Sequence, residues 1–233
     1  MNLDNSAKWY DNEKNRFSQR FRGESTFKLI LPYILKSERI LHLGLGNGLM
    51  VKRIDEFAKK QIVIEGSEKL IDGFKDKLLN TEIIHGYFES FDCDETFDLI
   101  LATHVLEHVD DPILLLTYLS SFLNENGKLL IIVPNAQSLH RRIGVELGII
   151  KTIYELHNGD KEMGHQRIYD IDKLRNDVLE TGYKIIREQG YLLKMRSLEQ
   201  IMNWNDDFIN ANYDVSLNCS IDICVNLMLI CEL

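Results

Sequence analysis

Short apolar runs and segments of helical periodicity alternate along the chain from residue 39 onward. Five apolar runs have the length of strands and end in turn residues: 39–43, 61–65, 82–85, 97–103 and 128–134. Between them, apolar positions repeat with the period of an α-helix over residues 49–60, 68–79 and 112–124. Strands that alternate with helices of this length predict a parallel sheet that is covered on both faces.

The segments on either side of this alternation predict further elements. Residues 1–36 read as helix, with apolar positions on one side at Phe17, Phe21, Phe27, Ile30 and Leu31. After Pro134 we expect a helix, a polar loop, a second helix and two strands, over residues 138–154, 155–165, 172–180, 184–193 and 223–231. The predicted fold is a doubly wound, Rossmann-like α/β structure. It has a mostly parallel seven-stranded sheet with helices on both faces, an N-terminal helical extension and an insertion after the fifth strand.

The chain is predicted to form a single domain over residues 1–233, because no internal repeat or Gly/Ser-rich linker divides it. Within it we expect four parts, in chain order. They are a helical N-terminal cap, a cofactor-binding core, a substrate-side insertion with its helix, and the C-terminal strands, at residues 1–37, 38–134, 135–182 and 183–233.

Composition narrows the partners and the location. Of 233 residues, 27 are Lys or Arg and 36 are Asp or Glu, so the formal net charge is -9. A chain this acidic is a poor ligand for nucleic acid or for an anionic membrane surface, and we expect neither as a partner. The sequence has no signal-peptide pattern and no apolar run of about 18 residues, which predicts a cytoplasmic protein.

A glycine-rich loop follows the first predicted strand. Gly44, Gly46 and Gly48 stand in G-x-G-x-G spacing, which differs from the G-x-G-x-x-G dinucleotide fingerprint and lacks the Lys-Ser/Thr of a Walker motif. Alone, such a loop can be a purely structural turn. Glu65 ends the next predicted strand, where a carboxylate can accept hydrogen bonds from both hydroxyls of a ribose. The two features together predict a cofactor that contains adenosine, at the carboxyl edge of the sheet.

The segments that carry these features, from the glycine loop through FDLILATHVLEHVDDP to GKLLIIVPNA, resemble class I S-adenosylmethionine-dependent methyltransferases. Two later segments, NAQSLHRRIGVELGII and GHQRIYDIDKLRNDVLETGY, are similar to a bacterial subgroup associated with surface-polysaccharide and nucleotide-sugar gene clusters. The resemblance implies transfer of a methyl group from S-adenosylmethionine to an oxygen or nitrogen of a small polar metabolite. The acceptor is expected to contain a sugar or a phosphate and to be an intermediate of surface-polysaccharide biosynthesis. S-adenosylhomocysteine is the expected product.

The resemblance also implies a set of cofactor-binding residues: Gly44, Gly46, Gly48, Glu65, Gly66, Tyr87, Phe88, Glu89, Thr103 and His104. Two positions depart from the usual pattern. Tyr87 stands where many relatives have aspartate, and His42 stands where the first motif usually has an acidic residue. Adenine is therefore expected to rely on stacking and on the backbone N–H of Phe88.

Three histidines are the expected catalytic residues, in the order His104, His165 and His140, because an imidazole can take a proton from an acceptor hydroxyl near neutral pH. Expected substrate-binding residues are Asn135, Arg141, Arg142 and Arg167. The alternative for each arginine is an ordinary surface ion pair, for example with Glu146 or Asp170.

His104, Glu107 and His108 form the string H-x-x-E-H, which matches the inverted zinc-protease signature. A strand runs directly into it, so the helix which that signature requires is not expected. The segment is also similar to the E-x-x-E-H stretch of ubiquinone-pathway O-methyltransferases, which hold a divalent ion there. Here His104 replaces the first glutamate, and we predict no metal, with a metal at these three residues as the alternative. A hydrogen-bonded pair that only fixes the loop is the third interpretation.

Two further functions stay open from the sequence: a quinone- or phenol-type O-methyltransferase, and a non-catalytic protein that binds S-adenosylmethionine. The late segment 197–220 also has two interpretations. It either covers the acceptor site or forms the contact of a homodimer.

Overall fold

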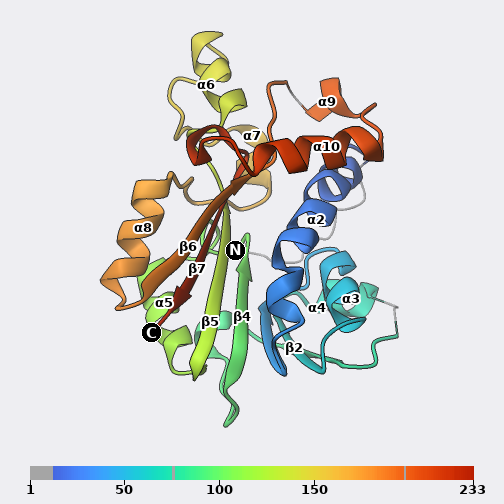
Figure 1. The fold of residues 1–233 in the computed structure, drawn as a ribbon, viewed down its shortest axis with the longest axis vertical. Coiled ribbons are helices and arrows are strands. Elements are labelled where there is room, and N and C mark those ends of the chain that lie inside the picture. The colour runs from blue at the N-terminus through green and yellow to red at the C-terminus, as the bar shows by residue number, and fades with distance from the viewer. Residues whose placement is uncertain (1–12, 75–76, 197) are drawn as a thin grey trace.

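A single seven-stranded sheet forms the centre of the molecule in a computed structural model that describes residues 13–74, 77–196 and 198–233 (Figure 1). The strands are β1 (Arg39–Leu43), β2 (Lys60–Glu65), β3 (Thr81–His85), β4 (Phe97–Thr103), β5 (Leu123–Pro134), β6 (Lys184–Tyr191) and β7 (Asn226–Glu232). Their order is β3-β2-β1-β4-β5-β7-β6, with β1 to β5 parallel and β7 antiparallel to both of its neighbours. The predicted fold class is confirmed.

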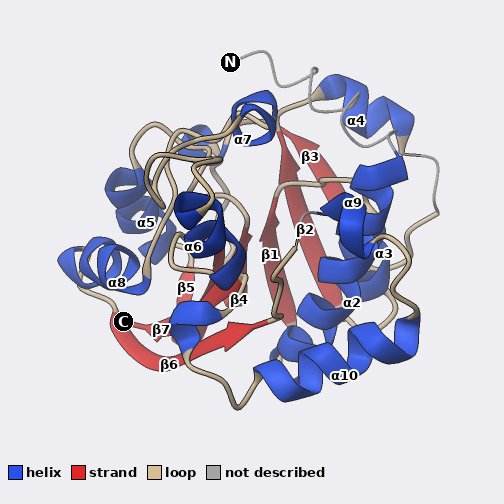
Figure 2. Ribbon diagram, turned by 90° about the horizontal axis from the view of Figure 1, so that it is seen from above, coloured by secondary structure: helices blue, strands red, loops and turns tan. Residues whose placement is uncertain are grey.

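Helices cover both faces of the sheet (Figure 2). The longer helices are α2 (Glu13–Ile34), α3 (Leu49–Asp55), α5 (Pro112–Ser120), α6 (Leu139–Glu146), α8 (Ile171–Glu180) and α10 (Asp206–Ser216). The shorter ones are α4 (Glu68–Gly73), α7 (Asn158–Glu162), α9 (Leu198–Ile201) and the 3-10 turns η2 (Phe88–Ser90) and η3 (Ile221–Ile223). One apolar core lies between the sheet and α5 with α8, and the other lies between the sheet and α2 with α9 and α10.

The predicted apolar side of the N-terminal helix is confirmed. Phe17, Phe21, Phe27 and Ile30 are buried in the second core, and the partly buried Leu31 packs against it. The first twelve residues, which the sequence assigned to the same helix, lie outside the described residues.

Four helices end earlier than the apolar periodicity predicted. The helix that begins at Leu49 stops at Asp55, although the buried Ala58 continues the pattern. Asp55 accepts hydrogen bonds from the backbone N–H groups of Leu79 and Asn80 at 3.0 and 2.8 Å, so its carboxylate ties this helix end to the start of β3. The other three stop at Gly73, Ser120 and Glu146. Periodicity marks what is buried and does not mark where helical hydrogen bonding stops.

Asn126 and Gly127 lie inside β5, because that strand starts at Leu123, which pairs with Phe97, and not at residue 128 as the apolar run predicted. A Cβ atom on Gly127 would be 2.8 Å from the carbonyl oxygen of Phe97, so the strands pass too closely for a side chain. The glycine is therefore required by strand packing.

The segment after β6 forms α9 and α10, which pack against α2. Trp204 contacts Phe21 edge to face at a centroid distance of 5.8 Å, and Lys28 donates to Asn210 at 2.7 Å. The segment thus covers the N-terminal helix, while the homodimer contact remains a prediction. Among the described helices, none combines the length and apolarity needed to cross a bilayer.

Candidate functional site

The glycine loop leaves β1 in a conformation that suits glycine. Gly44, Gly46 and Gly48 have φ values of 87°, 57° and 77°, in the left-handed region where other residues are strained. A Cβ atom on Gly48 would lie 2.2 Å from a ring carbon of Phe74, so the loop also needs a small residue there. The loop starts in register with the sheet because the Gly44 N–H donates to the carbonyl of Ile64 at 2.8 Å.

Glu65 connects this loop to the end of β2. Its carboxylate is buried and accepts from the backbone N–H of Leu45 at 2.8 Å through Oε2 and from that of Ser67 at 2.7 Å through Oε1. A carboxylate has about four acceptor sites, so two remain for ribose hydroxyls. The structure thus gives Glu65 a role in ordering the loop that the sequence did not indicate.

The stretch after β3 lies beside the same loop. Phe88 begins the 3-10 turn η2, and its ring is 3.9 Å from the position of a Cβ atom on Gly44. Tyr87 is exposed, as is Glu89, and Gly66 accepts a hydrogen bond from the ring of His85 at 3.2 Å. These residues occupy the edge where the adenine of the cofactor was predicted.

His42, the departure in the first motif, is a buried residue with its own partner. Its Nδ1 is 3.0 Å from the amide nitrogen of Gln61 on β2. Burial lowers the pKa of His42 to about 4, so the ring is neutral at physiological pH. It supplies no charge to replace the usual acidic residue.

His104 follows β4 in a strained conformation, with φ at 57°. Its Nδ1 lies 3.1 Å from Oε1 of Glu107, whose side chain is completely buried, while the His104 side chain is 27% exposed. Residues 104–108 form a turn, and the helix required by the zinc-protease signature does not form. Thr103 remains in β4, paired with Ile132.

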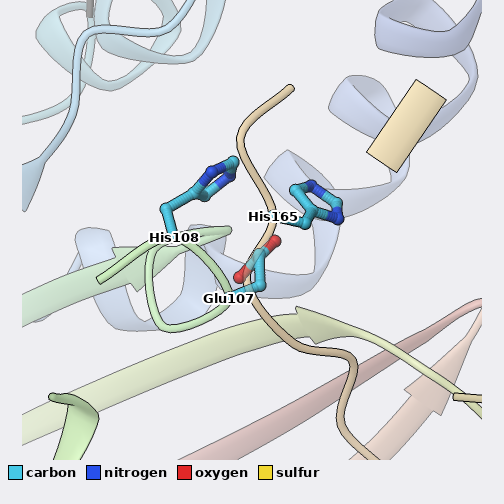
Figure 3. Close-up of side chains that lie close together, drawn as sticks. All are labelled: Glu107, His108 and His165. Carbon is cyan, nitrogen blue, oxygen red and sulfur yellow. The ribbon is translucent and has the colours of Figure 1, made fainter. Parts of the chain in front are cut away.

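Two further histidines flank the Glu107 carboxylate (Figure 3). His108 and His165 meet edge to face with their ring centroids 4.7 Å apart. One donor atom each from Glu107, His108 and His165 lies within 4.8 Å of the others, and Oε2 of Glu107 has no hydrogen-bond partner among the described residues. This donor set resembles the predicted metal alternative, with His165 in the place given to His104.

The charges of these groups depend on one another. Burial alone would raise the pKa of Glu107, but the hydrogen bond from His104 and the nearby imidazoles lower it below the usual range. Burial lowers the pKa of His165 despite the attraction of Glu107. The carboxylate is therefore ionised at neutral pH and His165 is neutral.

The segment 165–167 fastens the turn that carries Glu107. Arg167 donates to the carbonyls of Leu106 at 2.7 Å, Asp110 at 3.0 Å and Val109. The Gln166 backbone N–H donates to the carbonyl of Glu107 at 2.8 Å. To bind an acceptor, Arg167 would have to break its hydrogen bonds to these carbonyls. Its contacts therefore indicate a structural role.

Two other predicted substrate residues are also engaged within the protein. Asn135 donates to the carbonyls of Ile221, Asp222 and Cys224 at 3.2, 3.0 and 2.9 Å. Arg141 is 6% exposed and donates to the carbonyls of Ile153, at 2.8 Å, and of Glu155, and it pairs with Asp160 at 3.4 Å. Asn135 joins β5 to η3, and Arg141 holds the inserted segment together.

The remaining two predictions for this side differ in exposure. Arg142 is exposed, and His140 is partly buried, with no hydrogen-bond partner for its Nδ1. The open hollow lined by Lys59, Gln61 and Thr81 lies at the amino ends of β2 and β3, which is the opposite edge of the sheet. It is therefore unrelated to the cofactor edge.

A seven-stranded sheet with this strand order, a glycine loop after β1 and a buried acid at the end of β2 define the class I methyltransferase fold. Comparisons with known proteins agree. The family model described as a methyltransferase domain matches residues 14–188. The chain belongs to the methyltransferase-domain family. Membership confirms the predicted methyltransferase class, with S-adenosylmethionine as its cofactor.

Individual relatives are distant. The chain is 27% identical over 225 residues to an uncharacterized methyltransferase of Alkaliphilus oremlandii, covering 93% of this chain and 89% of that protein. It is 28% identical over 117 residues to a mitochondrial ubiquinone biosynthesis O-methyltransferase of Schizosaccharomyces pombe, covering 47% and 43%. A solved S-adenosylmethionine-dependent methyltransferase from Archaeoglobus fulgidus shares the fold at a TM-score of 0.64 and 17% identity, covering 93% and 98%.

Proposed function

We propose that the protein transfers a methyl group from S-adenosylmethionine to an oxygen or nitrogen of a small polar acceptor, a sugar or a sugar-linked group of surface glycan biosynthesis. The main support is the contact of the partly exposed His104 with the buried Glu107 just after β4, one strand away from the glycine loop of β1. The polysaccharide assignment follows from the resemblance of residues 135–150 and 164–183 to the subgroup described above.

The residues at the carboxyl edge fit the cofactor by their chemistry. The two free acceptor positions of the Glu65 carboxylate suit the ribose hydroxyls, and the ring of Phe88 suits stacking on adenine. Gly44, Gly46 and Gly48 leave room beside Thr103 and His104 for the methionine part. When bound, S-adenosylmethionine supplies an electrophilic methyl group on a sulfonium, which leaves S-adenosylhomocysteine.

The chain's own contribution is alignment and proton removal. Holding an acceptor in line accounts for as much as about 7–11 kcal/mol of a displacement barrier. The ionised Glu107 can only accept hydrogen bonds, so it holds the proton of His104 on Nδ1. Nε2 then carries the lone pair that can remove a proton from an acceptor hydroxyl. His104 is the proposed base, with His165 and His140 as the second and third candidates.

Binding and turnover test the proposal separately. We expect calorimetry to detect binding of both S-adenosylmethionine and S-adenosylhomocysteine, and glycan-precursor pools to stimulate release of S-adenosylhomocysteine. A protein that binds neither form at millimolar concentration would refute the proposal. Binding without turnover on any pool would favour the non-catalytic alternative.

A second function, O-methylation of a phenol with the help of a divalent metal, is favoured by the donor atoms of Glu107, His108 and His165. The relative from Schizosaccharomyces pombe is a ubiquinone biosynthesis O-methyltransferase, which agrees with this alternative. Turnover of catechols that is lost with a chelator and restored by Mg²⁺, Mn²⁺ or Zn²⁺ would support it. Turnover of sugar acceptors that is unchanged by the chelator would exclude it.

A further inference from the structure

Several buried polar atoms near the carboxyl edge have no hydrogen-bond partner within the part of the chain that the structure describes, and they do not belong to the predicted cofactor residues. They are Nε2 of Gln19, Oγ of Ser138, Nδ1 of His140, and Nδ2 and Oδ1 of Asn226. A buried polar atom without a partner costs about 1–3 kcal/mol. Four such residues from three parts of the chain indicate groups that a ligand would satisfy.

The strand contacts place these residues beside the ends of β5, β7 and β6. Asn226 begins β7 and lies opposite Pro134 on one side and Tyr191 on the other. The Tyr191 hydroxyl is 2.7 Å from the Thr26 hydroxyl, which joins the strand ends to α2. Ser138 and His140 follow directly after β5, at the same edge.

One face of α2 completes the arrangement. Gln19, Arg22 and Thr26 are spaced by three and four residues, so their side chains lie on one side of the helix. Thr26 touches Tyr191, and this face is therefore directed at the strand ends. We call Gln19, Arg22, Ser138, His140 and Asn226 the edge cluster.

Several positive charges act on His140 of the edge cluster. Burial lowers the pKa of His140 well below its usual value, and the charges of Lys194, Arg141 and Arg22 lower it further. Burial raises the pKa of Tyr191 and the charge of Arg22 lowers it in part, while the Arg22 guanidinium donates to the hydroxyl of Ser18 at 2.8 Å. Arg141 is paired with Asp160, whereas Arg22 lies on the face of α2 that is directed at the strand ends, so a positive charge faces this edge in a chain of net charge -9.

We propose that the edge cluster is the acceptor subsite and that it binds an anionic, hydroxyl-rich ligand, a phosphorylated or carboxylated sugar. This inference rests on the proposed function and adds the charge class of the acceptor and the residues that bind it. Amide, hydroxyl and neutral imidazole groups match sugar hydroxyls, and Arg22 with Lys194 balances the anion. The predicted substrate residues Asn135, Arg141 and Arg167 then serve to position the surrounding segments.

The test measures binding to the full chain saturated with S-adenosylhomocysteine, with glucose, glucose 6-phosphate, glucuronate and inorganic phosphate as probes. We expect the anionic sugars to bind at least tenfold more tightly than glucose, because one charge-assisted contact is worth about a factor of ten or more. Arg22→Gln should remove most of that preference. Equal affinity for glucose and glucuronate, or no response to any anionic probe at millimolar concentration, would overturn the inference.

Two matched variants separate binding from folding. Arg20→Gln changes a neighbouring exposed arginine, which contacts Trp204 and Asp206, and it should leave the preference for anions unchanged. Gln19→Leu removes an unpartnered amide, so it should maintain stability while it weakens probe binding. A Gln19→Leu protein that binds the probes like the wild type would count against the subsite. A wild-type protein that does not bind S-adenosylhomocysteine would refute the proposed function instead.

Discussion

Glu107 combines complete burial, negative charge and an unpartnered oxygen beside a strained histidine. An isolated carboxylate is rarely buried unless its charge is compensated. Here the compensation comes from imidazoles, His104 above all, through a contact of 3.1 Å. Burying this carboxylate and straining the His104 backbone both cost folding free energy. We therefore expect the pair to serve function.

Replacing Glu107 by glutamine tests whether it positions His104. The amide cannot fix the proton of His104 on Nδ1 as the carboxylate does, so we expect kcat to fall roughly 100-fold. The affinity for S-adenosylhomocysteine should stay within about twofold, since Glu107 is not among the predicted cofactor residues. Both quantities can be measured by release assays and calorimetry.

A double variant of His104 and Glu107 supplies the control for that prediction. His104→Asn with Glu107→Gln should be no slower than the slower single variant, because residues that act as a unit lose their effect together. Glu82→Gln, at an exposed position on β3, should leave kcat unchanged. Independent, multiplicative losses would show that Glu107 acts on something other than His104.

The buried His42 should make the free energy of unfolding depend on pH. Its pKa is about 4 in the folded protein and about 6.5 when unfolded, so the unfolded chain binds more protons between these values. Stability should thus fall as the pH is lowered from about 6.5 to about 4, by up to about 3 kcal/mol from this group. Urea unfolding of wild type and His42→Gln over this range measures it. A slope that is the same in both proteins would contradict the prediction.

The glycine loop and the strap at residues 165–167 act at the scale of elements. Backbone N–H groups of the loop and of the turn after β2 converge on Glu65, and three carbonyls of the turn after β4 converge on Arg167. In each case one buried or partly buried charge orders a loop. Apolar side chains anchor the same loops, because Leu45 is buried beside Val51 and Val63, and Leu106 of the turn after β4 is buried in the core under α5.

The loop should not tolerate a side chain at Gly46. Its φ of 57° strains any other residue, and Gly46→Arg would fill the space predicted for the methionine part of the cofactor. We expect calorimetric binding of S-adenosylhomocysteine to be abolished. Gly23→Ala is the control, because Gly23 lies inside α2 with nothing within 4 Å of a Cβ atom. It should keep full affinity, and retained affinity in Gly46→Arg would refute the loop assignment.

The strap predicts a stability effect for Arg167. Arg167→Met removes three hydrogen bonds from a charged donor to carbonyls of the turn, so we expect a loss of about 2–4 kcal/mol in the free energy of unfolding. Arg142→Gln, at an exposed position, should change it by less than about 0.5 kcal/mol. Urea denaturation compares the two. An Arg167→Met protein of unchanged stability with weakened acceptor binding would contradict this expectation. It would support the substrate-binding role that the sequence predicted for Arg167.

At the scale of the whole molecule, the predicted cofactor residues and the proposed acceptor subsite lie on one sheet. The ends of β1, β2, β3 and β4 carry the predicted cofactor residues, while β5, β7 and β6 meet the edge cluster. The antiparallel β7 brings Asn226 to the same edge as the ends of the parallel strands. A ligand at this edge therefore contacts elements from the whole length of the chain.

Cofactor binding should accordingly stabilise the entire fold. S-adenosylhomocysteine at about 100 times its Kd adds about 2.7 kcal/mol, which corresponds to a rise in Tm of about 5–10 °C for a chain of this size. Differential scanning calorimetry measures the shift. Adenosine alone, which lacks the methionine part, should give a smaller one. An unchanged Tm at saturating ligand would show that the ligand does not bind the folded state preferentially.

The sequence by itself determined that there are strands near the predicted places and that helices cover both faces of the sheet, because burial periodicity is a local property of the chain, and its glycine spacing predicted the cofactor edge. Phe97–Thr103 and the three loop glycines needed no tertiary information. The ends of helices were less predictable, as at Asp55, where the carboxylate accepts from the backbone of Leu79, 24 residues later and just before β3.

Only the tertiary structure decided what the polar side chains do. Arg167 and Asn135 read as ligand-binding residues in the sequence, but their partners are carbonyls between 57 and 89 residues away. His165 is likewise brought next to Glu107 and His108 by folding, and Gln19 and Asn226 carry no motif at all. A polar side chain bonds to whichever group folding places within about 3 Å, and sequence distance does not encode that neighbour.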